Sequence, residues 1–448
     1  MSDDRFRGRE AGTIDELKSA VWLANKMRDA GMQPAGEDGT YFQFFDLYRR
    51  QVMPTSTVKI GDRSFRLEKD VIIPDVAPAN VDAPILFLGD VSAQDIEKLE
   101  VQGKAVAIKA SMDGIVNNMS LFAKRYPGFV ANKYYETLSR KGAVALILIA
   151  DDLVENNWNV LIPNFRRGRT GIKGFRDKIE PGLPVIWLHK SEENYLKNIQ
   201  ANLLANIQIQ LYKYPSVNVI GKIDGTDPKL KNEYVLFSGH HDYLGIRETL
   251  NGDSIDNGAN DNASICVAML AIGRAFKKQP AKRSALFVSH GAEEMGLLGS
   301  RWYAEHLTVP QKNIVAVLNG DLIAGNDVDS AGLLGALGPH KTSDELVNAA
   351  LQANKEGPDF KINKDWDHPD HPEYFFFRSD HAPYARIGIP VLFYTSLLTT
   401  WYHTPMDDVD HINLEKLYKM TEWIYRTGWK VANMPQKPDY RSDVKFER

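Results

Sequence analysis

Five short strings in the second half of the sequence bring together histidines and carboxylates, the side chains that most often bind divalent cations. They are Gly239-His240-His241-Asp242, Asn260-Asp261-Asn262, Glu293-Glu294, Asn319-Gly320-Asp321 and Tyr402-His403-Thr404. Two cations held about 3.5 to 4 Å apart can acidify a water molecule and polarise a carbonyl group. The strings together therefore predict a hydrolase with two metal ions.

Each string taken alone has a simpler interpretation. His240 could be a core histidine beside a surface Asp242, and Asp261 could cap a helix, since Asp and Asn are favoured at that position. Glu293-Glu294 could be a solvated charge pair. Asp321 could belong to a turn, and His403 could be an ordinary loop residue. We favour the metal site because all of these simpler explanations would have to hold at once.

Continuous apolar runs precede three of the strings, at residues 234–237, 285–288 and 314–318. Such runs are typical of strands buried on both faces of a parallel sheet. Ligand sites in open α/β sheets lie outside the carboxyl ends of the strands, which is where these strings fall. We therefore predict an α/β fold with a mixed, mostly parallel sheet flanked by helices.

Amphipathic patterns predict helices near 14–32, over 263–278 and over about 414–432. Residues 57–205 contain apolar runs of their own but few histidine or carboxylate clusters. We therefore predict that 57–205 form a separate structured domain beside the one that carries the metal strings.

Composition limits the partners and the compartment. The formal net charge is −4 and the pI near 6.3, so neither nucleic acid nor an anionic membrane is attracted globally. The sequence has no stretch of about 18 apolar residues that could span a membrane. The single cysteine, Cys266, follows a helical apolar pattern and is expected in the core. We expect a cytoplasmic protein, or a secreted or periplasmic one if a signal peptide has been removed.

The strings resemble peptidase family M28, zinc peptidases whose clan includes bacterial leucyl-type aminopeptidases and glutamate carboxypeptidase II. The segments that recur in the family's order are 238–242, 258–264, 292–300, 319–323, 378–381 and 402–405. The resemblance is strong over about 206–435 and also touches the N-terminal helix. Residues 57–205 resemble the protease-associated (PA) insert of such enzymes, which in relatives limits access to the cleft. The resemblance therefore implies an inserted, mainly β domain at 57–205 and a peptidase domain formed by 1–56 and 206–448.

The resemblance implies two Zn²⁺ ions, for which Co²⁺ or Mn²⁺ could substitute because nitrogen and oxygen ligands suit all three. One ion would be held by His240 and Asp321 and the other by Glu294 and His403. Asp261 would bridge the two ions.

The resemblance also implies catalytic roles. Glu293 would be the general base acting on the water between the metals, Asp242 would orient His240, and Tyr402 is a candidate donor to the oxyanion. The family often has a strained peptide between the bridging aspartate and the next residue, here Asp261-Asn262.

These roles predict a metallo-exopeptidase that acts on peptides, and we favour an aminopeptidase. A carboxypeptidase or dipeptidase of the glutamate carboxypeptidase type needs arginines for the terminal carboxylate, and Arg378 is the only candidate within a motif. A glutaminyl cyclase with one zinc and a receptor-like binding protein without catalysis are the remaining alternatives.

Two residues depart from the family pattern. Gly239 stands where many relatives have alanine, and Ile265 replaces a glycine that is common after the Asn-Ala-Ser segment. We expect the isoleucine to affect helix packing and not the metal ligands. His368 and His371 lie in a proline-rich stretch that we interpret as a loop bordering the cleft.

Overall fold

The computed structural model describes residues 1–446. The chain forms two compact units, Met1–Asp46 with Tyr214–Arg448, and Leu47–Lys213. The chain passes between them within β2 (Phe42–Val52) and β12 (Ile209–Ile223). Residues 47–56 and 206–213 thus belong to the second unit, which differs from the boundaries placed by sequence. Both strands continue through the boundary, so no turn residues mark it.

The first unit is built on a mixed sheet whose four central strands are parallel. These strands are, in spatial order, β16 (Ser284–His290), β13 (Tyr234–His240), β17 (Ile314–Gly320) and β20 (Val391–Thr395). Next to β16 lies the antiparallel β12, which also pairs with β1 (Gln33–Pro34), and on the other side follow β18 (Ser330–Leu334) and β19 (Lys361–Asn363). The three apolar runs are central strands as predicted.

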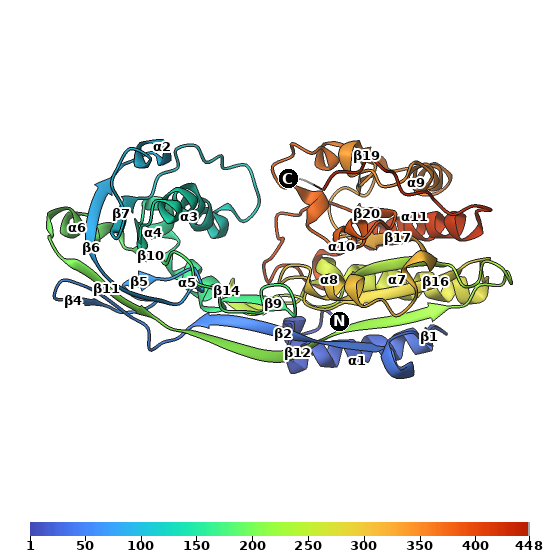
Figure 1. Cartoon of the computed structure of the whole chain (residues 1–448). Helices are drawn as coiled ribbons and strands as arrows, with labels where there is room; N and C mark the ends of the chain where they lie inside the picture. The colour runs from blue at the N-terminus through green and yellow to red at the C-terminus, as the bar shows by residue number, and fades with distance from the viewer. Residues whose placement is uncertain (447–448) are drawn as a thin grey trace. The chain divides into compact units, whose positions relative to one another are not determined.

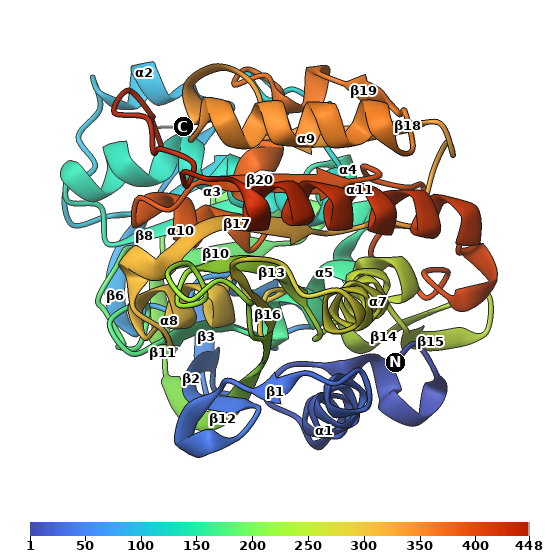
Figure 2. The same cartoon turned by 90° about the vertical axis from the view of Figure 1, so that its right-hand side faces the viewer.

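Helices cover both faces of this sheet (Figures 1 and 2). One face carries α1 (Ile14–Asp29), α7 (Ser264–Lys278), α11 (Leu414–Asn433) and α9 (Asp344–Glu356), in this order across the sheet in Figure 2. The shorter α8 (Leu298–Glu305) and α10 (His381–Arg386) contribute to the core on the other face. The fold class and the three helices predicted from periodicity are confirmed.

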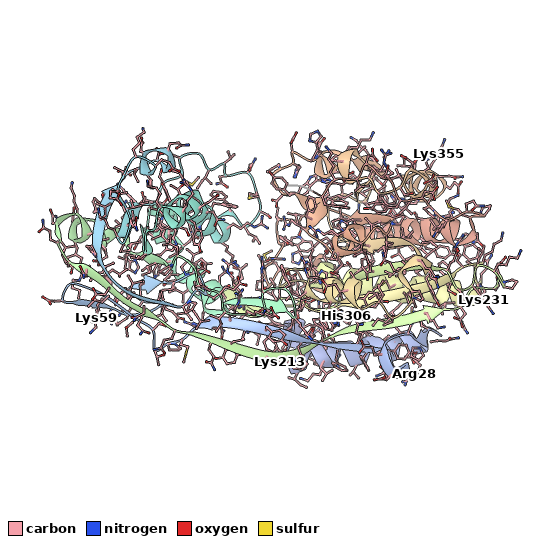
Figure 3. All side chains as sticks on the ribbon, in the orientation of Figure 1. Arg28, Lys59, Lys213, Lys231, His306 and Lys355 are labelled. Carbon is pink, nitrogen blue, oxygen red and sulfur yellow. The ribbon has the colours of Figure 1, made fainter. Side chains whose placement is uncertain are left out.

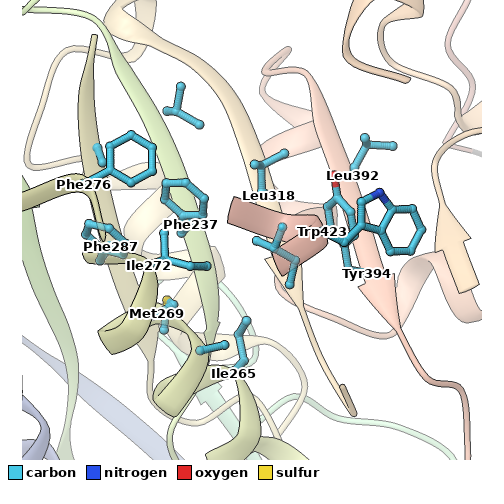
Figure 4. Packing of buried hydrophobic residues seen from close by; sticks show 14 of the residues in the cluster. Phe237, Ile265, Met269, Ile272, Phe276, Phe287, Leu318, Leu392, Tyr394 and Trp423 are labelled. Carbon is cyan, nitrogen blue, oxygen red and sulfur yellow. The ribbon is translucent and has the colours of Figure 1, made fainter. Parts of the chain in front are cut away.

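The core between the sheet and the longer helices is dense and aromatic (Figure 4). The ring of Phe237 stacks on Phe287 at 5.1 Å between centroids and meets Phe276 edge-on at 5.7 Å. On α11, Trp423 donates from Nε1 to the Ala350 carbonyl at 2.8 Å. Full burial of one such aromatic contributes about 2 to 3 kcal/mol, so these contacts fix the strands that carry the site.

Charged side chains lie on the outer faces of the elements. Arg28 on α1, Lys355 on α9 and Lys231 before β13 are exposed and extend outward in Figure 3. No helix among residues 1–446 is both long and apolar enough to cross a membrane.

The second unit contains an eight-stranded sheet. Its order is β4 (Arg63–Phe65), β3 (Thr57–Ile60), β11 (Asn202–Ile207), β6 (Ala79–Gly89), β7 (Ala105–Lys109), β8 (Ala145–Ile149), β10 (Val185–Leu188) and β5 (Val71–Ile72). Its helices are α2 (Ala93–Ile96), α3 (Phe122–Arg140), α4 (Asp152–Asn156), α5 (Trp158–Arg166) and α6 (Glu193–Asn198), and β9 (Arg169–Ile172) pairs with the end of β2. The apolar runs were identified as strands, but α3 was not recognised.

Gly239 and Ile265, the two departures from the family pattern, touch each other. A Cβ on Gly239 would overlap the Cγ2 of Ile265 and lie 2.8 Å from the Gly320 carbonyl oxygen. Ile265 is fully buried on α7. The missing side chain on β13 therefore makes room for the isoleucine.

We expect Gly239→Ala to destabilise the protein by about 1 to 3 kcal/mol, because overpacking forces the strand and helix apart. Ile265→Ala leaves a cavity and should cost about 2 to 5 kcal/mol. The double variant should lose less than the sum, since each change offsets the other. Urea unfolding of the four proteins measures this coupling, and strictly additive losses would contradict it.

Candidate metal centre

The carboxyl ends of the central strands place the side chains of the strings together. His240 is the last residue of β13, Glu293 and Glu294 follow β16, and Asp321 follows β17. His403 comes from the loop after β20. The structure therefore gathers all five predicted ligands and the predicted base in one site of the first unit.

Asp261 lies between two histidines. Its Oδ1 is 3.2 Å from His240 Nε2, and its Oδ2 is 3.4 Å from His403 Nε2. It precedes α7, but its side chain does not cap that helix. The helix-cap interpretation is wrong, and the two oxygens instead face two different partners, as a bridging carboxylate would.

The remaining carboxylates divide between the two histidines. Asp321 Oδ1 and Glu293 Oε2 lie 3.6 and 3.9 Å from His240 Nε2. Glu294 Oε2 lies 3.3 Å from His403 Nε2. Adjacent glutamates thus point to different halves of the site.

The donor set fits divalent cations. His240 Nε2, Glu294 Oε1 and Asp321 Oδ1 are buried without a hydrogen-bond partner in the described part of the chain. Buried polar atoms are normally paired, so such atoms call for a ligand. Two overlapping groups, His240-Asp261-Glu294 and His240-Glu293-Asp321, each offer ligand atoms within 4.8 Å of one another. Imidazole and carboxylate are the ligands that zinc takes in open, catalytic sites.

The carboxylates around the two histidines favour the protonated, positively charged forms of their rings. Burial lowers the pKa of His403, but Glu294 and Asp261 raise it to about 9. Burial also opposes protonation of His240, whose pKa is nevertheless raised well above its usual value by Glu293 and Asp321. Metal ions that bind here would displace these protons, because a ligating imidazole must be neutral.

Glu293 differs from an ordinary surface glutamate. Burial raises its pKa well above the usual value; His240 opposes this shift, whereas Glu294 adds to it. A buried carboxylate beside the predicted ligands can act as a general base. Its position therefore favours a general base over the solvated charge pair considered from sequence.

Asp242 holds the two halves of the site together. Its carboxylate accepts from the main-chain N–H of Glu293 at 3.0 Å and of Glu294 at 3.3 Å. His240 Nδ1 lies 3.2 Å from the main-chain carbonyl of Asp242, closer than the 3.8 Å to its carboxylate. Asp242 was expected to orient His240 through its carboxylate, and the carbonyl is the nearer partner.

Asp407 is a site residue that sequence reasoning missed. Its buried carboxylate accepts from the main-chain N–H of Asn260 at 2.7 Å and of Asp261 at 3.0 Å. It fixes the backbone that carries the bridging aspartate, where the Asp261-Asn262 peptide is cis. The only sequence signal for Asp407 was its position four residues after His403.

Arg9 was also missed. Its guanidinium is fully buried and donates to the carbonyls of His241 at 2.8 Å, Asn257 at 2.5 Å and Gly258 at 3.0 Å. These carbonyls flank the strand end and the loop before Asp261. No local motif marks Arg9, because these three partners lie more than 230 residues away in the chain.

Asp321 is oriented by a hydrogen bond from Ser379 in the segment before α10, which is itself held by Asn319 on β17. Ser379 Oγ donates to Asp321 Oδ2 at 2.8 Å, and Asn319 Nδ2 donates to Ser379 Oγ at 2.8 Å. Such outer partners fix metal ligands and are a large part of a metal site's design. They leave Asp321 Oδ1 free to face His240.

Tyr402 lies against the site. Its ring stacks on His403 at 3.7 Å between centroids, and its hydroxyl oxygen accepts from Arg378 Nη2 at 3.0 Å. The edge of the Tyr243 ring meets His403 at 5.9 Å. Aromatic rings thus enclose one half of the site.

Several candidate residues remain outside the site. His241 faces the core, where Val217 O lies 2.9 Å from Nε2, and burial lowers its pKa to about 4. Cys266 is buried in the core as predicted. His368 and His371 belong to neither candidate metal group.

Comparisons with known proteins show which family and which solved structures the chain resembles. Residues 218–427 match the model of Peptidase family M28. Over this range the chain is therefore similar to peptidase family M28.

Two curated relatives match over parts of their length. Aminopeptidase YwaD of Bacillus subtilis (strain 168) is 26% identical over 272 residues, which cover 57% of this chain and 53% of that protein. Leupeptin-inactivating enzyme 1 of Streptomyces exfoliatus is 29% identical over 248 residues, covering 49% and 50%. The chain thus spans about half the length of these relatives.

Two solved structures share the fold over nearly the whole chain. An aminopeptidase from Aneurinibacillus sp. strain AM-1 superposes with a TM-score of 0.59 at 18% identity, covering 99% of this chain and 95% of that one. BSAP, a zinc aminopeptidase from Bacillus subtilis, gives a TM-score of 0.58 at 19% identity, covering 99% and 97%. At these sequence identities, the superpositions show a shared fold and no more.

Proposed function

We propose that this protein is a zinc metallo-exopeptidase with two metal ions, and that it removes N-terminal residues from peptides. The observation that carries the proposal is the position of Asp261, whose two carboxylate oxygens face His240 and His403 separately. The match of residues 218–427 to the M28 family model and the aminopeptidase relatives support the same activity.

His240 and Asp321 would hold one zinc ion, Glu294 and His403 the other, and Asp261 would bridge them. When bound, the pair would acidify a water molecule and polarise the scissile carbonyl. Glu293 would take the proton from the attacking water and return it to the leaving amine. Tyr402 would donate a hydrogen bond to the oxygen on which negative charge develops.

Arg378 bears on the choice between aminopeptidase and carboxypeptidase. Its guanidinium is already paired with Glu373 and donates to Tyr402. A carboxypeptidase needs a cationic group free to bind the substrate's terminal carboxylate. The occupied arginine therefore supports an aminopeptidase.

We also propose that the second unit is a PA insert. Solved aminopeptidase structures that superpose over 99% of this chain support a shared fold in both units.

Hydrolysis of aminoacyl p-nitroanilides should be abolished by a chelator and restored by zinc, because the cations supply both the nucleophile and the electrophile. Metal analysis of the restored protein should give about two zinc ions per chain. Activity confined to C-terminal substrates would overturn the aminopeptidase assignment. One zinc per chain together with cyclisation of N-terminal glutamine would favour the cyclase.

A further inference from the structure

Arg378 is held by contacts on several sides. Its side chain is 15% exposed and its partner Glu373 only 5%. Nη1 pairs with Glu373, and Nη2 donates to the hydroxyl oxygen of Tyr402. The guanidinium carbon lies 5.2 Å from the ring centre of Phe375 and 5.8 Å from that of Tyr402. These contacts leave the guanidinium little freedom to move.

The hydrogen bond to Tyr402 has a defined direction. A guanidinium is only a donor, whereas a phenol oxygen can both donate and accept. Tyr402 must therefore be the acceptor toward Arg378, and its own hydroxyl proton is directed to another acceptor. Since the tyrosine ring stacks on His403, the hydroxyl group that carries this proton lies beside the candidate metal centre.

We propose that Arg378 is a positioning residue that acts through Tyr402, holding the tyrosine hydroxyl as a hydrogen-bond donor to the oxyanion of the peptidase reaction. This role rests on the proposed function. The hydrogen stays on Tyr402 throughout, so no covalent bond is made or broken at either residue. The hydrogen bond that Tyr402 accepts from the Arg378 cation strengthens the tyrosine hydroxyl as a donor, because hydrogen bonds in a chain polarise one another.

A role in binding substrate directly fits the contacts less well. The positive charge of Arg378 is matched by the buried carboxylate of Glu373. Breaking that pair to bind a substrate carboxylate would leave Glu373 buried and uncompensated, which is costly. Glu373 is therefore the anchor that keeps Arg378 directed at Tyr402.

A double-mutant cycle on the zinc-loaded protein tests the role. Tyr402→Phe should lower kcat on the order of 10²-fold, as loss of one oxyanion donor does. Arg378→Met keeps most of the stem and should lower kcat by about 10-fold to 10²-fold with KM unchanged. The double variant should be no slower than Tyr402→Phe, because Arg378 acts only through the tyrosine.

Two further variants separate positioning from folding. Arg378→Lys keeps a charge beside Glu373 and should recover part of the loss in kcat. Arg283→Met is the matched control, since the buried Arg283 pairs with the partly exposed Glu233 at 2.6 Å. This pair lies near the start of β16, the strand end opposite Glu293. This control should lose stability while its kcat and zinc content stay as in wild type.

An inhibitor gives a readout without turnover. An α-aminoalkyl boronic acid forms a tetrahedral adduct that resembles the transition state. Its affinity should fall by a similar factor in Arg378→Met and Tyr402→Phe. Three results would overturn the role of Arg378 while leaving the proposed function intact. They are losses in kcat that multiply in the double variant, a change in KM without a change in kcat, and undiminished boronate affinity in Arg378→Met. An inactive wild-type chain would overturn the proposed function, and this role with it.

Discussion

Glu293→Gln should retain its zinc and lose most of its turnover, on the order of 10²-fold or more in kcat. Glutamine has nearly the same shape, so the turn after β16 and its two hydrogen bonds to Asp242 should persist. What disappears is the only group in our scheme that takes the proton from water and returns it to the leaving amine. Steady-state kinetics with aminoacyl p-nitroanilides, together with metal analysis, measure both quantities.

Glu305→Gln provides the matched control for this variant. Glu305 lies exposed at the end of α8, a few residues after the same turn, and its replacement should change neither kcat nor zinc content. Near-wild-type turnover in Glu293→Gln would remove Glu293 from the mechanism. A parallel loss of zinc would instead make it a ligand.

Asp261→Ala should lose zinc from both positions. Its two oxygens face His240 and His403, so the substitution removes a ligand from each side at once. Asp321→Ala removes a ligand from one side only and should keep about one zinc ion per chain. Zinc stoichiometry after dialysis distinguishes the two variants.

Thermal unfolding offers a second measurement of the same loss. A ligand that binds only the folded state at 100 times its Kd stabilises that state by about 2.7 kcal/mol. Added zinc should raise the Tm of wild type and of the surface control Asp329→Ala but leave that of Asp261→Ala unchanged. Unaltered stoichiometry in Asp261→Ala would rule out the bridge.

The convergence of the proposed metal ligands could be predicted in part, because three of them follow strands that are easily recognised. Buried parallel strands have continuous apolar sequences, and their carboxyl ends meet at one edge of the sheet. His240, Glu294 and Asp321 therefore converge for a reason visible in the sequence. The string with His403 was recognised from its residue types, and the family resemblance added the distribution of roles.

The residues that support the ligands could not be found in the same way. Arg9 and Asp407 act on the main chain of other loops, and main-chain partners leave no pattern of residue types. The pairing of Arg378 with Glu373 depends on how the segment before α10 folds, which periodicity does not describe. The unit boundaries were displaced because β2 and β12 pass through them without a turn.

The contact between Gly239 and Ile265 also limits the order in which these residues could have been acquired. Starting from alanine at 239 and glycine at 265, as the family pattern indicates, isoleucine first would collide with the alanine on β13, the strand that ends in His240. Glycine first would leave only a small gap, which the isoleucine could then fill. The order with glycine first therefore costs less stability, and a return to alanine at 239 is disfavoured for as long as the isoleucine remains.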